Sequence, residues 1–176
     1  MYFFQVPAVV LALIAQLNLF SFFMVDGPSM EPTLQSGQVF ILDQFSYGVA
    51  KPKRGDIVVF NLADKPDYFY VKRIVGLPGE KISVNDDGVY LHFAGGGEEK
   101  LDESYLGPVT VSTEDALRQS ELSLINRSNA EKLYLVPMDK YFVLGDNRTH
   151  SLDSRYFRDS YVSKPEIKGK YLFTLF

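Results

Sequence analysis

The first 25 residues, Met1–Val25, contain no charged side chain, and 20 of them are apolar. A helix over residues 2–25 would be ~36 Å long, which exceeds the ~30 Å hydrocarbon core of a bilayer. A cleavable leader usually begins with basic residues, but the first basic residue here is Lys51. Scattered polar residues such as Gln16 leave a buried core helix as the other alternative. The sequence favours a transmembrane anchor over 1–25, whose orientation is undetermined because flanking basic residues are lacking.

Residues 26–176 carry all of the net charge of −4 and are numerous enough to build a core of their own. The absence of cysteine excludes a disulfide scaffold, a thiolate metal site and a cysteine nucleophile. The excess of acidic residues argues against a nucleic-acid partner, because phosphate recognition needs a basic surface. We therefore expect an anchor at 1–25 and a single further domain at 26–176.

This further domain has the pattern of a mainly β fold. Short runs of β-branched, aromatic or aliphatic residues are bounded by Gly, Pro, Asn or Asp, and turn signals such as Leu77-Pro78-Gly79 separate them. Because helices do not alternate with these runs, we predict a mainly antiparallel β domain, barrel-like or sandwich-like. The predicted strands are 38–43, 56–60, 68–75, 81–84, 89–93, 132–136, 141–144 and 171–175.

A polar, irregular section at 94–131 interrupts the strand pattern. It opens with Gly95–Gly97 and contains one candidate helix, Glu114–Ile125, preceded by Ser112-Thr113 and acidic in its first turn. We interpret this section as an insertion on the β scaffold.

Motifs for metals and phosphates are weak. The two histidines, His92 and His150, lack the spacing of zinc ligands. Asp86-Asp87-Gly88 lacks the remaining ligands of a calcium loop and fits a hairpin turn better. Gly95–Gly97 is not followed by the lysine of a phosphate-binding loop. We expect neither a metal nor a cofactor.

Two reactive residues have an unusual context. Ser29 stands between Pro28 and Pro32 in a Gly-containing turn, which restricts its backbone. Lys72 shares a strand face with apolar neighbours and follows the pattern of a residue that can be buried. For half of the Lys72 amines to be neutral near pH 7.5, the pKa would have to lie ~3 units below its ordinary value. This difference corresponds to a free energy of ~4 kcal/mol, which only a largely dry site supplies. The positive charge of adjacent Arg73 would lower the pKa of Lys72 further by repulsion. Taken singly, a loop serine and a solvated edge lysine remain sufficient explanations.

The third feature is the run Tyr141–Phe157, in which a strand leads into a polar turn. Two acids and two arginines within ten residues indicate ion pairs that brace a loop, with the serines left to form hydrogen bonds. On its own, this run is explained equally well by a stable polar turn. The charged residues are Asp146, Arg148, Asp153 and Arg155.

These features in this order, behind an apolar N-terminal segment, resemble the bacterial type I signal peptidases (leader peptidases) of the serine–lysine class. The matching segments are 29–34, 54–60, 70–80 and 145–157. The resemblance implies a single-pass protein of the cytoplasmic membrane of a bacterium, with one N-terminal transmembrane helix. Its catalytic domain at 26–176, a coiled antiparallel β-sheet or barrel, would lie on the outer side. It also implies cleavage of signal peptides from exported preproteins, with small residues before the cleavage site and the lipid bilayer as a second partner.

The resemblance assigns Ser29 as the nucleophile that forms an acyl-enzyme and Lys72, as a neutral amine, as the general base. Ser151 would orient the amine. The oxyanion hole would use the Ser29 backbone N–H and a backbone donor at Gly27, where some members have a serine hydroxyl. The residues expected to support the site are Arg73, Asp146, Arg148, Asp153 and Arg155.

The chain departs from the family pattern at Phe157, where Trp is common, and at Arg158, in place of Gly. His150 neighbours Ser151, but a serine–histidine enzyme would place its base where Lys72 lies. The apolar residues around Met30 and Phe40–Leu42 either enter the lipid interface or form core. Two alternatives stay open: a processing protease of the same fold that matures pilin or conjugation components, and a catalytically silent membrane-tethered assembly factor.

Overall fold

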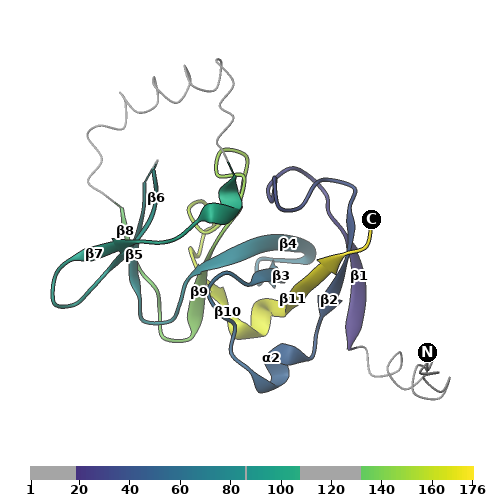
Figure 1. Ribbon diagram of the computed structural model, residues 1–176. Helices are drawn as coiled ribbons and strands as arrows, with labels where there is room; N and C mark the ends of the chain where they lie inside the picture. The colour runs from purple at the N-terminus through teal and green to yellow at the C-terminus, as the bar shows by residue number, and fades with distance from the viewer. Residues whose placement is uncertain (1–18, 86, 108–131) are drawn as a thin grey trace, which may run out of the picture.

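The computed structural model describes residues 19–85, 87–107 and 132–176, which form two antiparallel β-sheets (Figure 1). The larger sheet has the strand order β1-β2-β11-β3-β4-β9-β10, and the smaller one β7-β6-β5-β8. The prediction of a mainly β, antiparallel fold is confirmed. The strands are β1 (Phe20–Met24), β2 (Val39–Asp43), β3 (Ile57–Leu62), β4 (Lys65–Gly76), β5 (Lys81–Asn85), β6 (Gly88–His92), β7 (Glu98–Lys100), β8 (Leu133–Leu135), β9 (Lys140–Leu144), β10 (Val162–Ser163) and β11 (Ile167–Thr174).

Helical elements among the described residues are short. They are α2 (Ser46–Val49) and the 3₁₀ turns η1 (Ser104–Leu106) and η2 (Lys164–Glu166). In this part of the chain we find no helix with the length and apolar character needed to cross a membrane.

The end of the predicted transmembrane segment is a strand. β1 pairs with β2 in a regular antiparallel register from Phe20↔Asp43 to Met24↔Val39, so the helical prediction is wrong for these residues. An uncharged run does not by its periodicity distinguish a helix from a strand. In β1, Phe20, Phe22 and Met24 are exposed, whereas Phe23 packs against the core. Residues 1–18, the remainder of the predicted anchor, lie outside the described residues.

Strand β9 of the large sheet contributes side chains to two hydrophobic clusters. Its alternate residues Tyr141 and Val143 belong to a cluster under the large sheet, whereas Phe142 and Leu144 belong to the cluster beneath the small sheet. Both sets are buried. Because one strand contributes to two cores, the small sheet is held against the large one at the point where β4 pairs with β9.

The residues considered for lipid contact lie in a third cluster of core residues. Met30, Phe40 and Leu42 have no exposed surface and pack with Val25 and Leu34. The interpretation of these three residues as core is confirmed. Burial at Met30 also anchors the loop that carries Ser29.

The section at 94–131 is described only as far as residue 107. It contains β7 and η1, and β7 adds an edge strand to the small sheet through pairing with β6. β7 has the sequence Glu-Glu-Lys, and all three residues are exposed. It therefore has no hydrophobic alternation by which it could be recognised. The predicted helix at 114–125 lies outside the described residues.

Candidate active site

Ser29 lies in the loop between β1 and β2, where it is half-buried and directly precedes buried Met30. Met30 and Leu34 are buried, and the Leu34 N–H donates to the Met30 carbonyl at 2.9 Å. The Ser29 carbonyl accepts a hydrogen bond from the Asn147 N–H at 3.2 Å. The loop is therefore fixed both by its own core contacts and by the segment that follows β9.

Lys72 lies in the buried half of β4 and is 3% exposed. Its Nζ donates hydrogen bonds to Ser29 Oγ and to the Val71 carbonyl, both at 2.7 Å. The fold thus brings together the two residues proposed from the sequence, although 43 positions separate them.

Burial lowers the pKa of Lys72 to about 8, against the opposing effect of the Asp153 and Asp146 carboxylates, which raise it. The dominant cause is desolvation, because an ammonium loses its hydration in a dry site. With a pKa of about 8, roughly one amine in ten is neutral at pH 7. Such an amine can accept a proton from a neighbouring hydroxyl at near-neutral pH.

The segment after β9 is braced by an internal ion pair. Asp153 is fully buried; its carboxylate accepts from Arg155 Nε at 2.8 Å, from Arg155 Nη2 at 2.9 Å and from the Gly145 N–H at 3.0 Å. Ser154 Oγ accepts from the Val143 N–H at 2.9 Å. These contacts fold the segment back onto β9. Of the internal ion pairs that the pattern of charges predicts, only Asp153–Arg155 forms, whereas Asp146 and Arg148 pair with residues outside the segment.

A family model described as signal peptidase, peptidase S26, matches residues 1–176. The chain belongs to this family. A signal peptidase I of Bacillus caldolyticus is 38% identical over 164 residues, which cover 92% of this chain and 84% of the relative. A signal peptidase I of Bacillus licheniformis is 35% identical over 170 residues, which cover 96% of this chain and 83% of the relative. A solved signal peptidase I from Enterococcus faecalis V583 matches 69% of this chain and 97% of its own, at 30% identity and a TM-score of 0.46.

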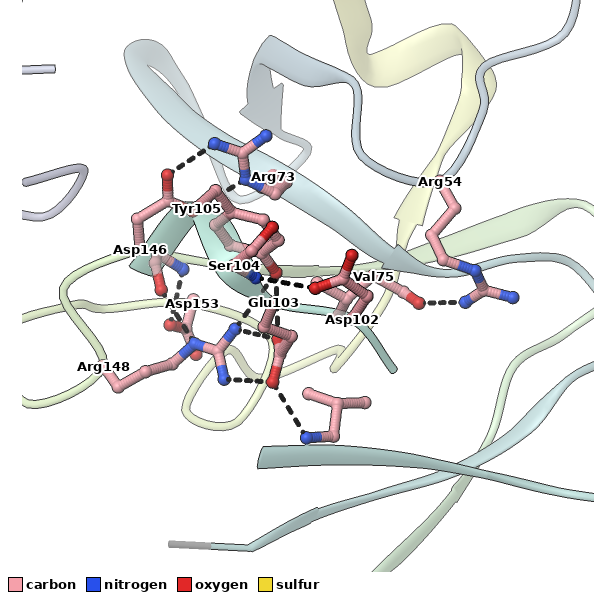
Figure 2. A network of polar contacts seen from close by, with 12 residues as sticks. Arg54, Arg73, Val75, Asp102, Glu103, Ser104, Tyr105, Asp146, Arg148 and Asp153 are labelled. Carbon is pink, nitrogen blue, oxygen red and sulfur yellow. Dashed lines mark hydrogen bonds and ion pairs between the residues drawn. The ribbon is translucent and has the colours of Figure 1, made fainter. Parts of the chain in front are cut away.

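Arg73, the neighbour of Lys72, is paired with Asp146 in this family member (Figure 2). Its Nε and Nη2 donate to the two carboxylate oxygens at 2.9 and 2.6 Å, and its Nη1 donates to the Gly55 carbonyl at 2.9 Å. The Asp146 carboxylate balances the charge of the guanidinium. Arg73 therefore repels the Lys72 ammonium less than the sequence led us to expect. Thr33 Oγ1 also donates to Asp146, a contact that the sequence did not indicate.

Ser151 is buried next to Ser29 but does not hydrogen-bond Lys72. Its Oγ has no hydrogen-bond partner within the described part of the chain, so the predicted contact with the amine is not formed in this conformation. A Cβ built on Gly145 would lie 2.1 Å from Ser151 Oγ and 2.5 Å from the Ser29 carbonyl oxygen. Gly145 therefore permits the close approach of these two loops, a role that its place at a strand end could have signalled.

Gly27 does not present a free backbone donor. Its N–H donates to Ser36 Oγ at 3.1 Å, and its φ of +88° is in the left-handed region that favours glycine. The expected second oxyanion donor at Gly27 is therefore engaged elsewhere in this conformation. His150 is exposed and contacts Thr149 and Asn147, not Ser29.

The fifth supporting residue, Arg148, is paired with Glu103, which sequence reasoning missed. Glu103 lies in the section predicted to be an insertion, 45 positions from Arg148. No local pattern connects two residues so far apart in the chain.

Proposed function

We propose that this member of the signal peptidase family hydrolyses signal peptides from preproteins, with Ser29 as nucleophile and Lys72 as general base. The observation that carries the proposal is the 2.7 Å contact between Lys72 Nζ and Ser29 Oγ, made by an amine that is 3% exposed. A dry amine of lowered pKa, next to a hydroxyl, is the arrangement that activates a serine without a histidine.

In the first half of the reaction, the neutral Lys72 amine takes the Ser29 proton as Oγ attacks the scissile carbonyl. The backbone N–H of Ser29 stabilises the oxyanion. Collapse of the tetrahedral intermediate breaks the C–N bond, and the Lys72 ammonium gives its proton to the leaving amine. The signal peptide remains as an ester on Ser29 until water, deprotonated by Lys72, hydrolyses it.

The ion pairs around the amine support this chemistry through their charge balance. An unpaired Asp146 or Asp153 would raise the pKa of Lys72 further, because each carboxylate stabilises the ammonium. Arg73 and Arg155 neutralise these two carboxylates. We propose Ser151 as the partner of the amine once Ser29 is acylated, because an ester oxygen is a poorer acceptor and the Ser151 hydroxyl is buried nearby.

We further propose that the uncharged N-terminal segment holds the protein at the cytoplasmic membrane of a bacterium as a single-pass anchor, with the catalytic domain outside. Because β1 belongs to the sheet, we propose that the anchor ends at about residue 19 rather than at residue 25. Ser29 then follows the end of the anchor by ten positions, five of which form β1. A substrate with small residues before the cleavage site would bind extended, by strand addition.

The direct test compares Ser29→Ala and Lys72→Met with Ser160→Ala and Lys81→Met, which alter residues away from the pair. We expect cleavage of a preprotein to fall by at least ~10³-fold in the first two variants, the scale for loss of a nucleophile or its base. Normal turnover by either variant, with intact circular dichroism, would refute the proposal. A panel of general preproteins and pilin-type precursors separates the proposed function from specialised processing.

A further inference from the structure

A turn from the small sheet reaches the catalytic loops. After β7 the chain runs through residues 101–107, which we call the Glu103 turn and which include η1. It is attached to the small sheet where the Leu101 N–H donates to the Val89 carbonyl at 2.8 Å. Figure 2 shows Glu103 and Tyr105 of this turn among Arg148, Asp146 and Arg73 of the site.

Glu103 forms a buried ion pair with Arg148. Its side chain is 8% exposed, and Arg148 Nη2 donates to its Oε1. The carboxylate also accepts from the Val89 N–H at 3.0 Å and from the Tyr105 hydroxyl at 2.9 Å. With these donors, the carboxylate is held on the small sheet while its charge is directed at Arg148.

Arg148 transmits this contact to the loop next to Ser29. Its Nε donates to the Gly145 carbonyl at 3.1 Å, and its own carbonyl accepts from Arg155 Nη2 at 2.7 Å. Gly145 is the residue packed against Ser151 and the Ser29 carbonyl. A continuous chain of polar contacts therefore leads from Glu103 to the site.

Tyr105 makes a second, independent contact. The guanidinium of Arg73 lies 3.9 Å from the centre of the Tyr105 ring, a cation–π contact. The ring thus covers the same guanidinium that pairs with Asp146. A Cβ on Gly107 would lie 3.5 Å from Pro32, which places the end of the turn beside the Ser29 loop as well. One short turn thus contacts β4, the segment after β9 and the loop of Ser29.

We propose that Glu103 and Tyr105 are positioning residues of the catalytic site: they hold Arg148 and Arg73, and through these the loops that surround Ser29 and Lys72. Neither residue touches the reacting atoms. The inference rests on the proposed Ser29–Lys72 function and assigns the small sheet a part in it. Arg148 contacts Gly145 of the catalytic loops on one side and Glu103 of the turn on the other. Arg73 likewise contacts Asp146 and Tyr105. The geometry of the site therefore depends on the small sheet, to which the turn is attached.

The sign of the electrostatic effect follows from the charges. Glu103→Gln removes a buried negative charge and leaves the Arg148 guanidinium without its partner next to Gly145. An unbalanced positive charge on Arg148, whose Nε donates to the Gly145 carbonyl, disfavours the Lys72 ammonium, so the acid limb of the kcat profile should move to lower pH. The carboxylates that act on Lys72, those of Asp153 and Asp146, are unchanged in the variant.

The experiment measures kcat, KM, the pH profile and the thermal midpoint of Glu103→Gln and Tyr105→Leu in the full-length protein with a preprotein substrate. We expect kcat to fall about tenfold or more, KM to stay within about twofold, and the acid limb of Glu103→Gln to shift as stated. The milder Tyr105→Phe keeps the ring and removes only the hydroxyl contacts with Glu103 and Arg148; its kcat should fall about two- to fivefold.

Glu80→Gln is the matched control, because Glu80 also pairs with an arginine, Arg54, and accepts a backbone N–H, that of Leu77. A structural role alone would lower the thermal midpoint in both glutamate variants and leave the pH profile unmoved. If kcat of Glu103→Gln and Tyr105→Phe stays within about twofold of the parent, or falls only in step with the control, the inference is wrong. Activity retained by Ser29→Ala or Lys72→Met would instead overturn the proposed function.

Discussion

The buried amine of Lys72 should make the protein less stable than a variant with an uncharged side chain at this position. Burial lowers its pKa from the ordinary 10.5 to about 8, a difference that corresponds to about 3 kcal/mol. The unfolded chain therefore binds more protons than the folded protein between these two values. By linkage, the free energy of unfolding rises with pH through this window, and the full cost of burying the ammonium applies below about pH 8.

Replacing Lys72 with Met, which is unbranched and similar in size, removes this cost along with the activity. The substitution also removes two hydrogen bonds, to Ser29 Oγ and the Val71 carbonyl, each worth ~0.5–1.5 kcal/mol. Together these bonds are worth ~1–3 kcal/mol, so we expect the variant to be more stable than the parent by about 0–2 kcal/mol at pH 7, or by up to roughly 8 °C in thermal midpoint. Near pH 10.5 the parent no longer carries the cost, so the variant should there be less stable by about 1–3 kcal/mol.

Urea unfolding at both pH values, followed by circular dichroism, measures the two differences. Lys81→Met is the control, because Lys81 is exposed on β5 and its substitution should change stability equally at both pH values. A Lys72→Met variant that is less stable than the parent at pH 7, or whose difference does not change sign, would show that the amine is solvated. The proposed base would then lack its physical justification.

Three further predictions concern the surroundings of the amine. The rate constant kcat/KM should rise about tenfold per pH unit below pH 8 and level off above it; a rate that is flat from about pH 6 to 9 would contradict an amine base with a pKa of about 8. Gly145→Ala should reduce cleavage by at least about 100-fold, because its Cβ would lie within 2.5 Å of the Ser29 carbonyl oxygen. Gly95→Ala, where space is open, should cleave normally. Asp146→Asn should destabilise the protein by ~3–5 kcal/mol in urea unfolding, because buried Arg73 loses its partner; it should also shift the acid limb of the rate to lower pH, since Asp146 raises the pKa of Lys72. A shift to higher pH would contradict that assignment.

Much of the fold could be predicted because its strands carry local information. Alternation and turn residues identified eight of the strands to within a few residues, β3 and β9 among them. The strands that were missed lack such signals: β7 is entirely polar, and β10 has only two residues. β1 was assigned to a helix because an uncharged run satisfies both patterns, and its pairing with β2 decides the matter.

The candidate site divides along the same line. Restricted backbone at Ser29, the strand position of Lys72 and the charges after β9 are properties of short segments, so the sequence alone indicated which residues to consider. Their distances, the burial that lowers the pKa of Lys72 and the lone hydroxyl of Ser151 depend on loops brought together across more than 40 positions. The pair of Glu103 and Arg148 belongs entirely to this second kind. Desolvation and ion pairing depend on which surfaces meet, and that is decided only when the two sheets pack around β9.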